Sequence, residues 1–159
     1  MVLRLTQEHL SEISDHAERV YPEECCGLLL GELEGATARK QLIEVVALEN
    51  TWSAGEEEAL TKTRRYTIDP RDMLRSQKYA REKALQIIGI YHSHPDHPAI
   101  PSECDRAQAW SEYAYVIVSV CEGNAVDTQN WALDSEQQFC PEPITVVPAA
   151  EVKRLPTSA

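Results

Sequence analysis

Apolar residues recur along this chain with two periods, and the longer period marks the helices. One run of apolar positions spaced by three or four residues predicts a helix over residues 6–20, which Pro22 then ends. These apolar positions are Leu10, Ile13, Ala17 and Val20. The Asp69-Pro70 pair predicts a second helix from residue 69 to 84, because aspartate caps helix N-termini and proline suits the first helical position.

Short apolar runs, bounded by glycine or by polar residues, mark the strands. They predict strands over residues 26–31, 41–48, 86–91, 113–121 and 144–147. A turn at Gly123-Asn124 allows residues 125–132 to return as a strand that pairs with the one before it. Residues 50–65 show no clear period, and we predict a loop there of the kind that often borders a functional site.

The mixture of helices, a hairpin and separated strands predicts a layered α/β fold. A chain of 159 residues suits one domain, which we assign to residues 1–147, and we expect a loosely ordered tail over 148–159. No apolar run approaches the roughly 20 residues that span a membrane. The N-terminus also lacks the apolar core of a signal peptide, so we expect a cytoplasmic protein without a membrane partner.

Charge and cysteine usage narrow the function classes. The net charge is −11, and basic residues form only short pairs such as Arg64-Arg65, so a nucleic-acid partner is not expected. The five cysteines are Cys25, Cys26, Cys104, Cys121 and Cys140. Their number is odd and no CxxC spacing occurs, which disfavours a disulfide framework and a four-cysteine zinc site. We therefore expect free thiols that pack as small apolar groups or have no role.

The densest chemistry lies in the stretch HSHPDHPAIPSECD, residues 92–105. His92 and His94 follow a predicted strand, and residues two apart on a strand point to the same side, so both imidazoles aim at one point. Three prolines in the loop that follows limit its conformations and lower the entropy cost of ordering it. The two histidines are candidate metal ligands, whereas His97 lies in the proline loop without a strand-spaced partner and is left out.

Ser102 and Asp105 extend this candidate site. They open a helix predicted over residues 102–112, where a spacing of three puts them on one side of the first turn. The pair also has the pattern of a capping box, and the two interpretations are compatible. Two nitrogens and one carboxylate suit zinc, and three protein ligands leave a fourth position for water, as in catalytic sites. Cys104 is expected to point elsewhere on the helix.

The spacing H-x-H-x7-S-x2-D, with a proline after the second histidine and another before the serine, resembles the signature of the JAMM (MPN+) zinc metalloprotease family. A second stretch, Pro22 to Gly27, is similar to an element in which that family carries a catalytic glutamate. Glu24 is the matching position, and Glu23 is the alternative if the register differs by one. By composition alone, Glu24 would be a solvated acid at a helix end. The resemblance spans roughly residues 3–147.

This resemblance implies a fold and a mechanism. The fold is a single MPN/JAMM-like domain with a mixed β-sheet flanked by helices, similar to that of cytidine deaminases. The site holds one catalytic zinc ion on His92, His94 and Asp105. Glu24 is the general base toward the zinc-bound water and returns the proton to the leaving amine, and Ser102 donates a hydrogen bond to the oxyanion.

The resemblance also implies a substrate class, namely amide or isopeptide bonds at the C-terminal tail of ubiquitin or ubiquitin-like proteins. The chain is most similar to small bacterial members that act on ubiquitin-like sulfur-carrier proteins, either trimming residues after the diglycine tail or releasing cysteine from an adduct. We expect that class, with the tail bound in extended form by strand addition. The alternatives are a deubiquitinase acting on ubiquitin itself, a non-catalytic MPN-type scaffold, and a DNA-repair-associated branch. A zinc deaminase is disfavoured because no P-C-x-x-C ligand pair occurs.

Overall fold

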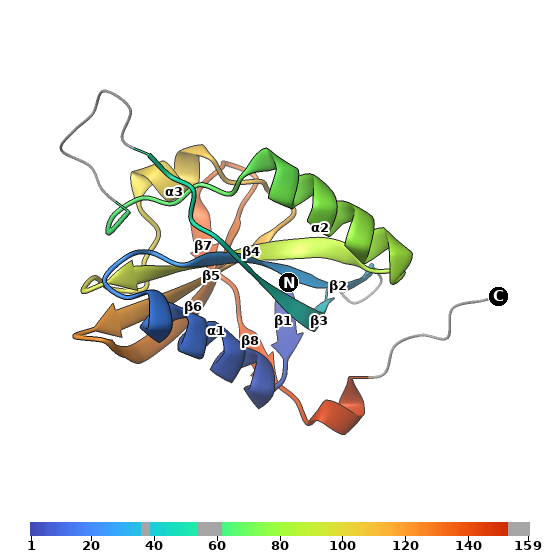
Figure 1. Ribbon diagram of the computed structural model, residues 1–159. Helices are drawn as coiled ribbons and strands as arrows, with labels where there is room; N and C mark the ends of the chain where they lie inside the picture. Colours follow the sequence, from blue (N-terminus) through green and yellow to red (C-terminus); the bar gives the residue numbers. More distant parts are fainter. Residues whose placement is uncertain (36–38, 54–61, 153–159) are drawn as a thin grey trace.

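The structure is a computed structural model that describes residues 1–35, 39–53 and 62–152, and Figure 1 shows their arrangement. The described strands form one mixed sheet of eight strands in the order β7-β6-β5-β4-β2-β3-β1-β8. The strands are β1 (Val2–Leu5), β2 (Cys26–Glu34), β3 (Arg39–Leu48), β4 (Gln86–Pro95), β5 (Ala114–Cys121), β6 (Asn124–Leu133), β7 (Phe139–Pro141) and β8 (Ile144–Val146). The helices are α1 (Gln7–Val20), α2 (Pro70–Glu82), α3 (Glu103–Ala107) and the short 3-10 helix η1 (Ala149–Glu151). The predicted α/β fold with a helix-flanked mixed sheet is confirmed.

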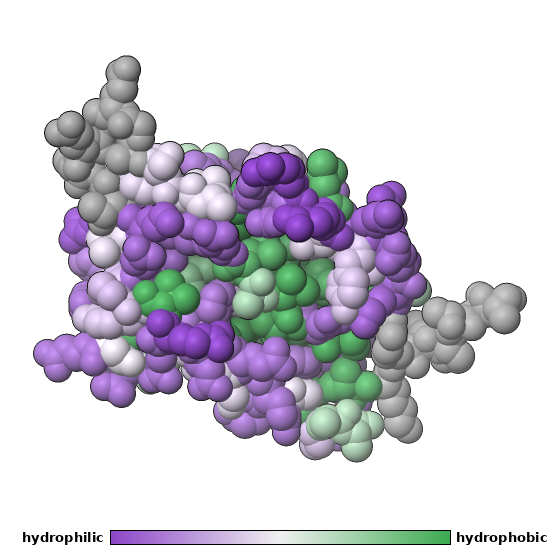
Figure 2. Space-filling view, viewed as in Figure 1, coloured by the Kyte–Doolittle hydropathy of each residue, from purple (hydrophilic) through white to green (hydrophobic). Residues whose placement is uncertain are grey.

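The sheet separates two apolar cores, because successive side chains of a strand point to opposite faces. In β2, Leu29 packs with Ile13 of α1, whereas Leu28 and Leu30 pack on the other face with Ala80 of α2. The two helices accordingly cover opposite faces of the sheet (Figure 1). Figure 2 shows apolar side chains gathered between these helices and hydrophilic side chains around them.

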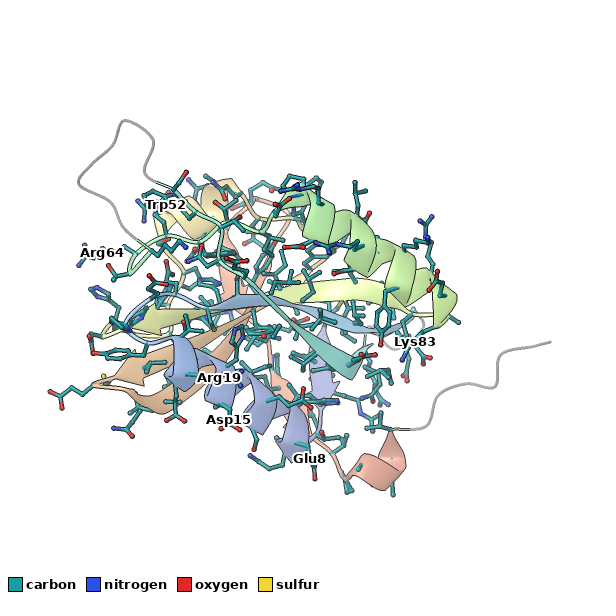
Figure 3. All side chains as sticks on the ribbon, viewed as in Figure 1. Glu8, Asp15, Arg19, Trp52, Arg64 and Lys83 are labelled. Atoms are coloured by element: carbon teal, nitrogen blue, oxygen red, sulfur yellow. The ribbon has the colours of Figure 1, made fainter. Side chains whose placement is uncertain are left out.

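Helix α1 begins where its sequence predicts. Thr6 caps it by accepting a hydrogen bond from the backbone N–H of His9 at 3.2 Å, and the His9 ring accepts one from Thr6 N at 3.0 Å. Figure 3 shows Glu8, Asp15 and Arg19 along α1, and all three are exposed. The predicted start of α2 is also confirmed, since the Asp69 side chain accepts from the N–H of Arg71. The described part of the chain contains no helix long and apolar enough to cross a membrane.

All six predicted strands are present, but three features differ from the predictions. The sequence analysis missed β1 and β7, which have only four and three residues and give too short a periodic signal. The third helix, predicted to reach residue 112, ends at Ala107 because turns follow it. In these turns Trp110 N donates to the hydroxyl of Tyr115 at 2.6 Å. Strand β4 continues to Pro95, so the two histidines lie within the strand rather than after it. Of the predicted tail, residues 153–159 lie outside the described residues, and the boundary at residue 147 stays a prediction.

The sheet curls until its two edges approach each other. Strand β7 lies at one edge and β8 at the other, yet only Glu142 and Pro143 separate them in the chain. Glu142 N donates to Asn130 O at 2.9 Å, and Leu3 N donates to Pro143 O at 2.9 Å. The Glu142 carboxylate is buried, pairs with Lys40 Nζ at 3.0 Å and accepts from Asn130 Nδ2 at 2.8 Å. This polar cluster joins strands from the two edges.

We expect Glu142→Gln to destabilise the protein by about 3 to 5 kcal/mol, because it leaves the Lys40 ammonium buried without a counter-charge. Urea unfolding followed by circular dichroism measures this. Glu103→Gln is the matched control, since it removes a carboxylate from the exposed ion pair with Arg106 and should leave the transition unchanged. Equal midpoints for Glu142→Gln and the unmodified protein would contradict the prediction.

Candidate metal centre

Strand β4 delivers both candidate histidines to one point. His92 and His94 lie on the face of the sheet that Ile90 shares with α2, as the alternation of side chains requires. Their Nε2 atoms are 3.1 Å apart. His92 is fully buried and His94 is partly buried, so most of the pair is shielded from solvent.

Helix α3 brings the Asp105 carboxylate to the same point. Ser102 Oγ accepts from Asp105 N at 3.0 Å and Ser102 N donates to Asp105 Oδ2 at 2.8 Å, so the predicted capping box is present. Asp105 Oδ2 also lies 3.3 Å from Nε2 of His92 and 3.3 Å from Nε2 of His94. The capping box therefore holds the carboxylate where a metal ligand is needed.

These three atoms have the spacing that zinc requires. Ligands at 2.0–2.1 Å in a tetrahedron are about 3.3 Å apart, and the observed edges are 3.1, 3.3 and 3.3 Å. His94 Nδ1 donates to Pro98 O at 2.8 Å, which fixes the tautomer that leaves a lone pair on Nε2. The residues present therefore fit a zinc ion, with a fourth position open.

The pKa shifts of Asp105 and His92 favour the protonation states that bind a cation, whereas that of His94 does not. Burial raises the pKa of Asp105, but hydrogen bonds with His92 and His94 outweigh it, and the net pKa is lowered. Burial lowers the pKa of His92. Burial also acts to lower the pKa of His94, but the hydrogen bonds with Asp105 and Pro98 raise it overall. An ionised carboxylate beside a neutral His92 is the state that a metal ligand set needs.

Glu24 approaches the same two histidines from the turn before β2. Its carboxylate lies in a group with His92 and His94 whose ligand atoms are all within 4.8 Å of one another. Asp105 Oδ2, at 3.3 Å from both Nε2 atoms, completes a triangle of three ligand atoms with the histidines, so Glu24 is available for a role beside that ligand set. The Glu24 side chain is buried, and its Oε2 has no hydrogen-bond partner among the described residues. Glu23, the alternative position, is exposed.

Burial raises the pKa of Glu24 to about 8, because removing a carboxylate from water penalises its charged form. Perturbed acids of this kind are common among groups that transfer protons. The position of Glu24 is fixed through its backbone. Its N–H donates to Lys62 O at 2.7 Å, and its carbonyl accepts from Asn50 Nδ2 at 3.0 Å.

The raised pKa of Glu24 predicts a pH-dependent stability for the metal-free protein. Between about pH 4.5 and 8 the folded chain keeps a proton that the unfolded chain has released, so the free energy of unfolding falls as the pH rises. Glu24→Gln mimics the protonated acid, and we expect it to stabilise the metal-free protein by on the order of 1 to 4 kcal/mol at pH 8 and by little at pH 4.5. Urea unfolding with chelator at both pH values checks this, and equal gains at the two values would refute it.

Two residues that the sequence analysis did not single out support the site. Asn50, in the segment predicted as a loop, is buried and uses its whole amide. Its Nδ2 donates to Glu24 O and to Arg65 O at 3.0 and 2.9 Å, and its Oδ1 accepts from Trp52 N and Thr67 N at 3.0 and 3.1 Å. Tyr66 stacks on the His92 ring with centroids 4.6 Å apart. The sequence signal for Asn50 is its position two residues after the end of β3 at Leu48. Residues 54–61 of the predicted loop lie outside the described residues.

Two cavities meet at Glu24. The cavity of about 180 Å³ is also lined by Asp105 and Cys104, and the cavity of about 280 Å³ is also lined by His94 and Ser102. The Ser102 hydroxyl only accepts in the capping box, so its hydrogen is free to donate into the second cavity. Cys104, which the sequence analysis left out of the site, lines the same cavity as Asp105 but is not in the group formed by Glu24 and the two histidines.

The remaining candidates lie outside the ligand set. His97 Nε2 accepts from Arg64 Nη2 at 3.0 Å, and His97 is not in the group formed by Glu24 and the two histidines. Burial raises the pKa of Cys25 to about 11 and that of Cys26 to about 12. Both buried residues are therefore thiols at neutral pH and suit packing rather than nucleophilic attack.

Comparison with protein families and curated proteins gives concordant matches. Residues 6–134 match the family described as prokaryotic homologs of the JAB domain. The chain is 32% identical to a probable TtuB-protein conjugate cleaving protease of Thermus thermophilus, over 74% of this chain and 70% of that protein. It is 29% identical to a desampylase of Haloferax volcanii, over 69% of this chain and 72% of that protein.

Solved structures show the same fold. A solution structure of a protein from Salinibacter ruber has a TM-score of 0.69 and 35% identity, and the match covers 95% of this chain and 94% of that one. Another, from Desulfitobacterium hafniense, has a TM-score of 0.76 at 24% identity and covers 98% of this chain and all of that one. The second likeness shows the fold alone.

Proposed function

The chain belongs to the family of prokaryotic homologs of the JAB domain, and from this premise we propose that it is a zinc-dependent metallopeptidase of JAMM type. The observation that carries the proposal is the triangle of two imidazole nitrogens and one carboxylate oxygen, with edges of 3.1 to 3.3 Å, beside a buried glutamate. This arrangement combines a ligand set with an acid–base group.

We propose that its substrates are amide bonds at the C-terminal tail of ubiquitin-like proteins, in particular sulfur-carrier proteins, in the cytoplasm. The names of the two curated relatives support this class, since one is described as cleaving TtuB–protein conjugates and the other as a desampylase. The two cavities lined by Glu24 support it too, because they offer room for an extended tail next to the ligand triangle.

The proposed mechanism gives each side chain one task. His92, His94 and Asp105 hold the ion. Zinc supplies Lewis acidity and a hydroxide nucleophile at neutral pH when bound. Glu24 becomes a carboxylate when a cation occupies the neighbouring ligand set, so its unpaired Oε2 can take a proton from water and return it to the leaving amine. The free hydroxyl hydrogen of Ser102 can donate to the oxygen of the scissile carbonyl as negative charge develops there.

The test is hydrolysis of intact carrier proteins, read by mass spectrometry. The substrates are a carrier with residues added after its diglycine tail, a carrier–cysteine adduct, and ubiquitin with the same extensions. We expect cleavage after the second glycine of the carrier, loss of cleavage with chelator, and recovery when zinc is restored. Preferred cleavage of ubiquitin would change the substrate, and no cleavage of any of them by the zinc-loaded protein would leave only a binding scaffold.

A further inference from the structure

Two arginines border both cavities at the candidate metal centre. Arg64 and Arg65 lie between β3 and α2 and line, together with Glu24, the cavities of about 180 and 280 Å³. Figure 3 shows Arg64 at the same end of the molecule as Trp52. Since the chain has a net charge of −11, two adjacent cations at its catalytic cleft require a specific explanation.

The segment that carries these arginines is fixed relative to Glu24. Asn50 Nδ2 donates to the carbonyls of both Arg65 and Glu24, at 2.9 and 3.0 Å. Arg65 Nη1 donates to Arg64 O at 2.8 Å, and Arg64 Nη2 donates to His97 Nε2 at 3.0 Å. The two guanidinium groups are therefore held at the cleft before any substrate binds, which lowers the entropy cost of using them.

With respect to the residues that the structure describes, most of the hydrogen-bonding capacity of these two groups is unused. In the part of the chain that the structure describes, neither guanidinium forms an ion pair with a carboxylate. A guanidinium has five N–H donors in a planar fork, and within the described ranges each of these two groups uses one of them, in the bonds given above. The ligand that such a fork prefers is a carboxylate, which accepts two parallel bonds.

We propose that Arg64 and Arg65 bind the α-carboxylate of the leaving group, an inference that rests on the proposed function. On the acyl side of the scissile bond, a diglycine tail carries no charge. On the amine side, a lysine within a protein has its carboxyl carbon in a peptide bond, whereas a single C-terminal residue has a free carboxylate two bonds from the scissile nitrogen. The arginines thus select substrates extended by one residue over lysine isopeptides. The hydrolysis is otherwise unchanged: one water is consumed, the C–N bond breaks, and the residue leaves with a free amine.

Two peptides that differ only at the terminus test this. Both end in Gly-Gly-Ala, one as the free acid and the other as the carboxamide. We expect the zinc-loaded protein to prefer the acid by roughly 10- to 100-fold in kcat/KM, the range of charge-assisted hydrogen bonds. The double variant Arg64→Gln/Arg65→Gln should bring the ratio of kcat/KM for the acid to kcat/KM for the carboxamide close to one, and this ratio cancels any effect of Arg65 on Glu24 that both peptides share. Arg106→Gln, which removes an arginine of α3 paired with Glu103, is the matched control and should keep the preference.

Equilibrium binding separates this inference from the proposed function. Calorimetry with the zinc-loaded Glu24→Gln variant compares the affinities for the acid and the carboxamide without any turnover, and the two Arg→Gln changes are then added. Tighter binding of the acid that disappears with the arginines supports the inference even if no peptide is cleaved. Equal affinities and rates for the two peptides, or a preference that survives in the double arginine variant, would overturn it. Cleavage of neither peptide counts against the proposed function alone.

Discussion

Replacing Glu24 by glutamine is expected to lower kcat by about 10²- to 10⁴-fold, the usual contribution of a positioned acid–base group, without loss of zinc. The side chain keeps its shape but can no longer accept a proton at its buried, unpartnered oxygen. Because His92, His94 and Asp105 form a ligand triangle without Glu24, the metal content should be unchanged. Cleavage of a carrier fusion and metal analysis of the same sample measure both quantities.

Glu23→Gln is the control for this experiment. It makes the same chemical change one residue earlier, at an exposed position, and should leave activity and zinc content unaltered. Wild-type turnover by Glu24→Gln would remove Glu24 from the mechanism. A loss of activity in Glu23→Gln instead would move the general base to that residue.

Replacing His92 by alanine is expected to abolish zinc binding, and peptidase activity with it. The change removes one corner of a three-ligand triangle, so zinc affinity should fall by at least about 100-fold, since even residues that only orient a ligand contribute 10- to 100-fold. His92 is fully buried and stacks on Tyr66, so the variant also loses packing. Asp105→Asn, nearly the same size and at a less buried position, is the companion variant that should lose zinc with smaller effect on folding.

Competition with a chromophoric chelator measures the zinc affinity, and circular dichroism checks the fold. His97→Ala is the control, because His97 lies in the proline loop between β4 and α3, hydrogen-bonds Arg64 and is outside the ligand triangle. Full zinc occupancy in folded His92→Ala or Asp105→Asn would disprove the ligand assignment. Loss of zinc in His97→Ala would show that the ligand set extends into the proline loop.

Much of the site could be predicted because its chemistry is local in the sequence. His92 and His94 belong to one strand, and alternation alone puts them on one side. Ser102 and Asp105 belong to one helical turn, and the capping box fixes their relation. Such short-range geometry follows from backbone sterics and hydrogen bonding, so the spacing of the residues along the sequence is enough to predict it.

The sequence could not show which side chains from distant segments close on this point. Composition alone predicts a solvated acid at Glu24, and only the resemblance of the surrounding element to a protein family marks it as catalytic. Its burial and its pKa of about 8 arise only when β2 packs beside β4. Likewise, the contacts of Asn50 with Glu24 and Arg65, and the position of the arginines at the cleft, depend on how the segment before α2 lies across the sheet.

The sequence by itself determined the helices α1 and α2, the long strands, the family, and the local geometry of the two histidines and the capping box. Only the tertiary structure decided the closure of the sheet through Glu142, the end of α3 at Ala107 and the environment of Glu24. The physical reason is the range of the interactions: periodicity and capping act within one element, whereas desolvation and ion pairing depend on atoms that the chain brings together from far apart.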